Sequence, residues 1–159
     1  MALAKGTNSY ATVAEAETYF EDRIDVAAWT AASAPQKAQA LVTATNILET
    51  LEWVGVAISE VQSLAFPRNG VYFDPRLGID VSLSPTSVPS RIIIATYELA
   101  YHLLNNDGLL DDTGIVKDLS IGSIKLSTIL PASKVPNNVK RIIKPLRVNN
   151  GANLWWRAN

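Results

Sequence analysis

The residues that could do chemistry in this chain are few and widely spaced. His102 is the only histidine, and the chain has no cysteine. A catalytic or zinc-binding pair of histidines, a thiolate nucleophile, a disulfide and a cysteine-based zinc site are therefore excluded. No glycine-rich phosphate loop and no G-x-S-x-G elbow accompanies His102. Its neighbours on the predicted helix are apolar or aromatic, which favours a structural or surface role for it.

An acidic cluster is the remaining candidate for metal chemistry. Asp107, Asp111 and Asp112 could attract a cation, but their spacing departs from the alternating ligands of a calcium loop. A solvated loop accounts for them, and a small metal-dependent hydrolase is the enzyme hypothesis that they leave open. We therefore expect no catalytic residue, no metal site, no cofactor-binding site and no cofactor, and hence no enzyme.

Charge is spread unevenly along the chain, although its net value is only −1. Up to Glu60 there are three Lys/Arg and eight Asp/Glu, whereas the segment from Pro131 onward has six Lys/Arg and no acid. A solvated basic helix, head-to-tail contact between copies and contact with an anionic partner all remain open. The candidate basic contact surface consists of Lys134, Lys140, Arg141 and Lys144.

The elements that must position these residues are predicted to be mainly helical. Thr12 and Glu15 form a capping box that opens a helix to about Arg23. Ser33 and Gln36 form a second box, which opens a broad amphipathic helix to about Trp53, with Gly55 expected to close it. Residues 25–32, 90–106 and 136–145 are predicted as a helical turn, a central helix packed on the 33–53 helix, and a short helix.

Three further segments complete the predicted fold, a small helical bundle. Residues 54–88 read as a long Pro/Gly-rich loop that packs on a partner. Within 115–130 the apolar period changes to two and switches parity at Gly122, which predicts a short β-hairpin or a bulged strand. Residues 148–159 are predicted as an extended C-terminal arm. The domain division is thus 1–147, with the inserted loop 54–88 and the β segment 115–130, followed by the arm 148–159.

Two groups of side chains are expected to anchor contacts. Trp155 and Trp156 are large aromatics in a polar setting, and such residues anchor interfaces well, although the arm could also fold back on its own domain. The loop contributes two apolar anchors within a segment that Pro67 prevents from being helical. The candidate docking arm is Leu154, Trp155, Trp156 and Arg157, and the candidate inter-subunit or loop anchors are Gln62, Leu64, Phe66, Pro67 and Arg68.

Several motifs occur in a characteristic order along the chain. The most specific pair lies in the predicted 33–53 helix and in the loop after it: Gln36-Lys37-x-x-Ala40-Leu41-x-x-Ala44-Thr45-x-x-Leu48, of which Ala-Leu-x-x-Ala-Thr is the central part, and Gln62-x-Leu64-x-Phe66-Pro67-Arg68. The other motifs are Ser9-Tyr10-x-Thr12, Trp53-x-Gly55, Val88-Pro89 and Gly122-Ser123-Ile124-Lys125.

From Ser9 to about Leu146, this order resembles the head-to-tail adaptor (connector) proteins of tailed bacteriophages, some of which are labelled DnaT-like. Phe66 is a mild departure, since many members carry Trp there. The resemblance implies a structural virion protein at the neck, in a ring commonly of twelve copies beneath the portal, that joins capsid to tail and continues the DNA channel. The partners it implies are the portal protein, neighbouring adaptor copies, tail or tail-completion proteins, and duplex DNA passing through the lumen.

The alternative follows the DnaT-like label, a single-stranded-DNA-binding module in replication. In that case Lys134, Lys140, Arg141 and Lys144 would contact phosphates, and Trp155 and Trp156 would stack on bases. The apolar runs are too short to span a bilayer and no signal peptide is evident, so we expect a soluble protein in the host cytoplasm during assembly, with no membrane partner.

Overall fold

The computed structural model describes residues 2–105, 119–121, 124–126 and 135–148, and these residues form a mainly α-helical fold. The helices are α1 (Val13–Glu21), α2 (Ala27–Ala31), α3 (Ala34–Glu49), α4 (Ser90–Asn105) and α5 (Asn137–Ile143), and α5 continues into the 3₁₀ turn η1 (Lys144–Leu146). The short strands are β1 (Val56–Ala57), β2 (Arg68–Asn69), β3 (Val71–Asp74), β4 (Ile79–Ser82), β5 (Leu119–Ile121) and β6 (Ile124–Leu126).

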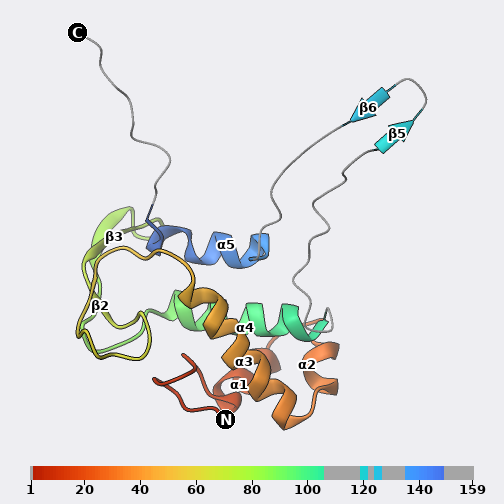
Figure 1. The fold of residues 1–159 in the computed structure, drawn as a ribbon, viewed down its shortest axis with the longest axis horizontal. Helices are drawn as coiled ribbons and strands as arrows, with labels where there is room; N and C mark the ends of the chain where they lie inside the picture. Colours follow the sequence, from red (N-terminus) through yellow and green to blue (C-terminus); the bar gives the residue numbers. More distant parts are fainter. Residues whose placement is uncertain (1, 106–118, 122–123, 127–134, 149–159) are drawn as a thin grey trace.

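Helix α4 is the centre of the core, as its apolar circumference predicts. It packs against α3, α5 and α2, and Figure 1 shows it between α5 on one side and the α1–α3 layer on the other. The predicted packing of α4 on α3 is thereby confirmed. The α4 side chains that are buried include Ile92, Ala95, Leu99, Ala100 and Leu103.

Both predicted capping boxes are present. The Thr12 hydroxyl accepts from the backbone N–H of Glu15, and the Glu15 carboxylate accepts from the Thr12 N–H at 2.8 Å. At α3, the Gln36 side chain accepts from the Ser33 N–H at 2.9 Å. These contacts lie within one helical turn, so the local sequence is sufficient to specify them.

The predicted end of the second helix is wrong. Helix α3 ends at Glu49 with Thr50 as its C-cap, and Trp53 lies in extended backbone, where it bridges to Arg147. Gly55 does have a positive φ of 77°, but it closes no helix. A Cβ there would lie 2.2 Å from the Asn69 carbonyl oxygen, so glycine is required by the close approach of β2.

The segment 54–88 is more structured than a loop. Strands β1 and β2 pair antiparallel, and β3 and β4 form a second antiparallel ribbon with the register Val71↔Ser82 to Asp74↔Ile79. The β-branched and aromatic run Val71-Tyr72-Phe73 and the alternating Ile79-Asp80-Val81, on either side of a turn, were the signal for it. In the later β segment, β5 pairs antiparallel with β6, in agreement with the hairpin alternative, while Gly122 lies outside the described residues.

Candidate nucleic-acid interface

A groove of about 600 Å³ runs along the outer side of α5 and η1. Helix α5 buries Val139 and Ile143 against the core, which leaves its basic positions on the solvent side. Lys140 and Lys144 are four residues apart, so they lie on neighbouring turns of the same face. The lining combines four cations with one carboxylate and is therefore net positive: Glu52, Asn137, Lys140, Arg141, Lys144, Arg147 and Val148.

Arg147 reaches this groove because of a tertiary backbone contact. The Val54 N–H donates to the Leu146 carbonyl at 3.0 Å, and the Val148 N–H donates to the Glu52 carbonyl at 3.3 Å. Arg147 is therefore held in extended backbone beside residue 53. Its Nε is shielded from solvent and has no hydrogen-bond partner within the described part of the chain. Arg147 is one of the six basic residues after Pro131, but the predicted contact surface did not include it.

Two polar contacts fix α5 to α4. The Asn138 amide donates to a Glu98 carboxylate oxygen at 3.3 Å, and Arg91 Nη1 donates to the Ile142 carbonyl at 3.3 Å. Glu98 is itself buried and pairs with Arg23. The basic face of α5 is thus presented on a helix whose position is set by the core.

The structure brings together three of the four predicted basic residues, Lys140, Arg141 and Lys144. Lys134 lies outside the described residues. The predicted docking arm, with Leu154, Trp155, Trp156 and Arg157, also lies outside them, so the predicted base-stacking tryptophans keep their status as predictions.

The predicted loop anchors stabilise their own segment. Phe66 is 3% exposed, with its ring 5.3 Å from that of Trp53 and 6.3 Å from that of Tyr10, centroid to centroid. Leu64 is also buried. Gln62 donates to the Leu64 carbonyl at 2.6 Å and to the Pro67 carbonyl at 3.2 Å, and Arg68 donates to the Val54 and Gly55 carbonyls at 3.0 and 2.6 Å.

Hydrogen bonds that join Tyr10, Glu49 and Ala65 complete this anchoring. The Tyr10 hydroxyl donates to Glu49, whose other carboxylate oxygen accepts from the Ala65 N–H at 2.8 Å. Burial, reinforced by Glu49, raises the pKa of the Tyr10 hydroxyl well above its ordinary value, so Tyr10 stays a neutral donor. These contacts describe anchoring within one chain, and an inter-subunit role for the same residues stays a prediction.

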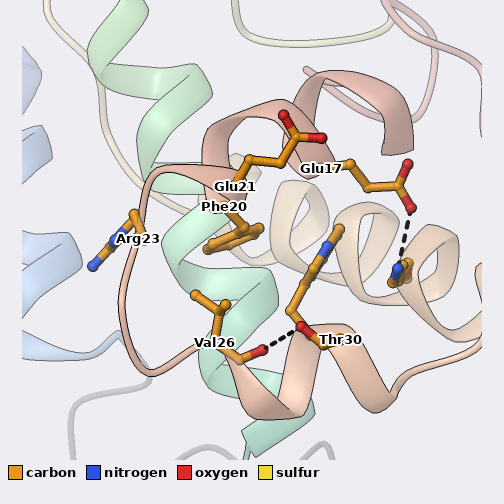
Figure 2. Close-up of a pocket in the computed structure, with 8 residues that line it drawn as sticks. Glu17, Phe20, Glu21, Arg23, Val26 and Thr30 are labelled. Carbon is orange, nitrogen blue, oxygen red and sulfur yellow. Dashed lines mark hydrogen bonds and ion pairs between the residues drawn. The ribbon is translucent and has the colours of Figure 1, made fainter.

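A second hollow, of about 400 Å³, lies between α1, α2 and the start of α3 (Figure 2). Its lining includes the aromatic Phe20 and Trp29 and the acidic Glu17 and Glu21. Both cations of this lining are already paired, Lys37 with Glu17 at 3.1 Å and Arg23 with Glu98. A phosphate-bearing ligand is disfavoured here, which leaves the α5 groove as the better anion site.

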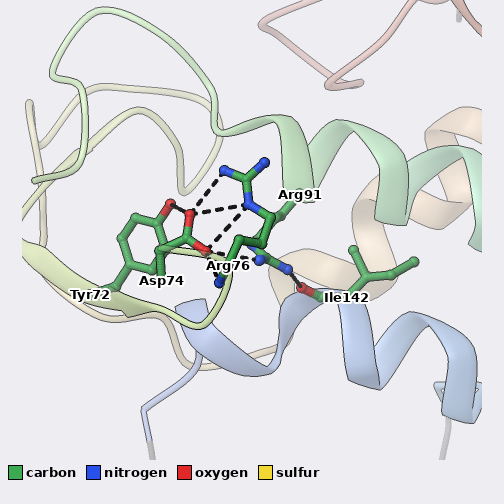
Figure 3. Close-up of polar contacts among 5 residues, drawn as sticks. All are labelled: Tyr72, Asp74, Arg76, Arg91 and Ile142. Atoms are coloured by element: carbon green, nitrogen blue, oxygen red, sulfur yellow. Dashed lines mark hydrogen bonds and ion pairs between the residues drawn. The ribbon is translucent and has the colours of Figure 1, made fainter. Parts of the chain in front are cut away.

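An ion-pair cluster around the buried Asp74 joins the β3–β4 ribbon to the helices (Figure 3). Asp74 at the end of β3 is fully shielded, and its carboxylate accepts from Arg76 at 2.9 Å and from Arg91 at 3.2 Å. Because Arg91 also donates to Ile142, the cluster connects β3, α4 and α5. The Arg76 side chain, followed by its backbone N–H and by Arg91, holds the pKa of Asp74 well below its ordinary value of 3.8, although burial acts to raise it.

This depressed pKa predicts acid sensitivity. A carboxylate with a lowered folded-state pKa stabilises the fold above its ordinary pKa, and that stabilisation is lost as the pH falls further. We expect the free energy of unfolding to decrease below about pH 4, and Asp74→Asn to flatten that part of the profile while lowering stability at neutral pH. Urea denaturation between pH 7 and 2 measures both. An Asp80→Asn variant, which changes an exposed carboxylate on the same ribbon, should keep the wild-type acid profile; equal profiles for all three proteins would contradict the prediction.

The sequence offered two candidates for chemistry, the acidic cluster after α4 and His102. No group of three or more His, Cys, Asp or Glu side chains in this part of the chain could hold a metal ion. His102 is half-buried in the last turn of α4 and lines none of the hollows described above. The cluster Asp107, Asp111 and Asp112 lies outside the described residues. Among the described helices, none has the length and apolar character needed to cross a membrane.

A family model described as "Putative DnaT-like ssDNA binding protein" matches residues 2–157 of the chain. No curated protein and no solved structure matches this chain.

This family match corrects the principal interpretation of the sequence. The expectation of a bacteriophage head-to-tail adaptor, a virion neck protein in a dodecameric ring around a DNA channel, was wrong, and the match agrees with the alternative. The physical reason lies in the motifs used. Leu41, Ala44 and Leu48 are buried core residues, and Phe66 closes the same core, so these motifs report how the chain folds and not where it is assembled. The expected portal, tail, ring and virion contacts followed from the resemblance alone.

Proposed function

We propose that this chain, which belongs to the DnaT-like single-stranded-DNA-binding family, is a non-catalytic module that binds single-stranded DNA through the groove on α5 and η1. The observation that carries the proposal is the convergence of Lys140, Arg141, Lys144 and Arg147 on one lining. Sequence-independent binding of this kind needs cations that follow the phosphate backbone and aromatic surfaces on which bases stack.

The arrangement of the cations supports a strand-like ligand. Lys140 in α5 and Lys144 at the start of η1 are four residues apart, and Arg147 directly follows η1, so positive charge extends along the groove. Arginine offers a planar fork of donors to phosphate oxygens, and lysine offers a compact point charge. Modest overall charge is compatible with this, because the acidic residues concentrate at the other end of the sequence.

A salt titration tests the proposal. Fluorescence anisotropy of a labelled 20-nucleotide oligo(dT) should show binding at physiological salt. The slope of log K against log salt concentration should be about −3, since about four phosphate contacts release counterions from a single strand. Duplex DNA of the same length should bind more weakly, because its bases are not available for stacking. Absence of binding at physiological salt, or binding that ignores salt, would overturn the proposal.

A further inference from the structure

The outward face of the β3–β4 ribbon carries an exposed aromatic ring. Phe73 is 55% exposed and Val71, two residues earlier on the same strand, is 57% exposed. Phe73 pairs with Asp80 across the ribbon, so the ring and this carboxylate share a face. The opposite face contributes the buried Asp74 to the ion-pair cluster of Figure 3. The exposed ring therefore stands on a strand whose other side is fastened to the helices.

This ribbon lies next to the basic groove, although none of its own residues lines that groove. Strand β3 lies against η1, which carries Lys144 at the groove wall, and Figure 1 shows β3 beside the η1 end of α5. The Asp74–Arg91–Ile142 chain of contacts fixes the distance between the ribbon and α5. Arg76 at the ribbon turn has a side chain that is 69% exposed, and its guanidinium is paired with Asp74.

Resting on the proposed function, we infer that Phe73 is a base-stacking residue and that the β3–β4 ribbon extends the single-stranded-DNA site beyond the groove. The occupant of this apolar face is a nucleobase of the strand whose phosphates lie along α5. Asp80 supports this orientation, since its carboxylate repels phosphate and so favours a base over the ring and the backbone over the cations. A rigid ribbon also limits the entropy lost when the ring is covered.

Two kinds of contact predict two separable effects. Stacking a base on an aromatic ring contributes affinity that does not depend on salt, whereas phosphate contacts determine the salt slope. Phe73→Ala should weaken oligo(dT) binding about tenfold without changing the slope. Phe73→Trp should restore or exceed wild-type affinity. Val71→Ala, which removes apolar area from the same face but no ring, should bind as the wild type does.

An abasic oligonucleotide of equal length isolates the stacking contribution. It keeps the phosphates and lacks the bases, so the wild type and Phe73→Ala should bind it equally. Circular dichroism melts check that all variants are folded, which the exposure of Phe73 favours. Wild-type affinity for oligo(dT) in Phe73→Ala, or an equal loss on the abasic strand, would overturn the inference while leaving the groove intact.

Two other outcomes are distinguishable from these. If the wild type bound no single-stranded DNA at all, the proposed function and the inference would fail together. If Phe73→Ala altered sedimentation behaviour and left oligo(dT) affinity unchanged, the face would be a contact between copies and the inference would be wrong.

Discussion

Replacing Lys140 and Lys144 by glutamine is expected to weaken binding of single-stranded DNA by about 1.5 to 2 orders of magnitude at ~0.05 M salt. The two ammonium groups line the same groove, and each phosphate that they neutralise releases a condensed counterion. The salt slope should become shallower by about 1.4 for the same reason. Anisotropy titrations at four or five salt concentrations measure both quantities.

A matched double variant distinguishes the effect of the groove cations on DNA affinity from the effect of net charge. Lys5→Gln combined with Lys37→Gln also removes two positive charges, but at the α1–α3 side, where these lysines pair with Glu15 and Glu17. It should change affinity far less than the groove variant does. Equal losses from the two double variants would mean that net charge, and not the groove, governs binding.

Phe66→Ala is expected to lower the free energy of unfolding by about 3–5 kcal/mol, because it removes a buried ring and leaves a cavity. The ring contacts both Trp53 and Tyr10, so its loss loosens the join between the 62–68 segment and the core. The melting temperature should fall by about 10 °C or more. Urea denaturation with a fluorescence readout measures the change.

Phe66→Leu serves as the control for this prediction. It keeps most of the apolar volume and should cost less than about 1.5 kcal/mol. Wild-type stability in Phe66→Ala, accompanied by a change in oligomeric state, would show that the residue acts between copies and not within its own chain.

The two experiments address different parts of one connected structure. Trp53 lies between Phe66, whose ring it contacts, and Arg147, whose backbone it bridges. Core packing around residue 66 therefore positions a groove cation about eighty residues further along the chain. For this reason the effect of Phe66→Ala is measured as a change in the free energy of unfolding. The lysine variants change side chains on the solvent side of the groove, so their effect is measured as a change in affinity for single-stranded DNA.

The motifs that resembled the adaptor family describe the fold of this chain and not its function. The Ala-Leu-x-x-Ala-Thr helix and the Phe-Pro-Arg segment were sound evidence about the fold, since their apolar residues are buried together. They gave no direct evidence about function, because a site depends on exposed side chains and a core motif contains few of them. The basic residues after Pro131 were the observation that pointed to an anionic partner.

Local sequence determined the helices and their starts. The capping boxes at Thr12 and Ser33 form within single turns, and the apolar periodicity of residues 90–105 is sufficient to specify α4. Three basic residues of the groove were likewise predictable, because α5 has one apolar and one basic face.

Only the tertiary structure decided the features that join distant segments. The end of α3 and the position of Arg147 depend on backbone pairing between residues 52–54 and 146–148. The partners of Asp74 come from its own turn and from α4, and the place of Phe73 beside the groove depends on the packing of β3 on η1. Such contacts are absent from any local window of sequence, since their energy comes from groups that become neighbours only when the chain is folded.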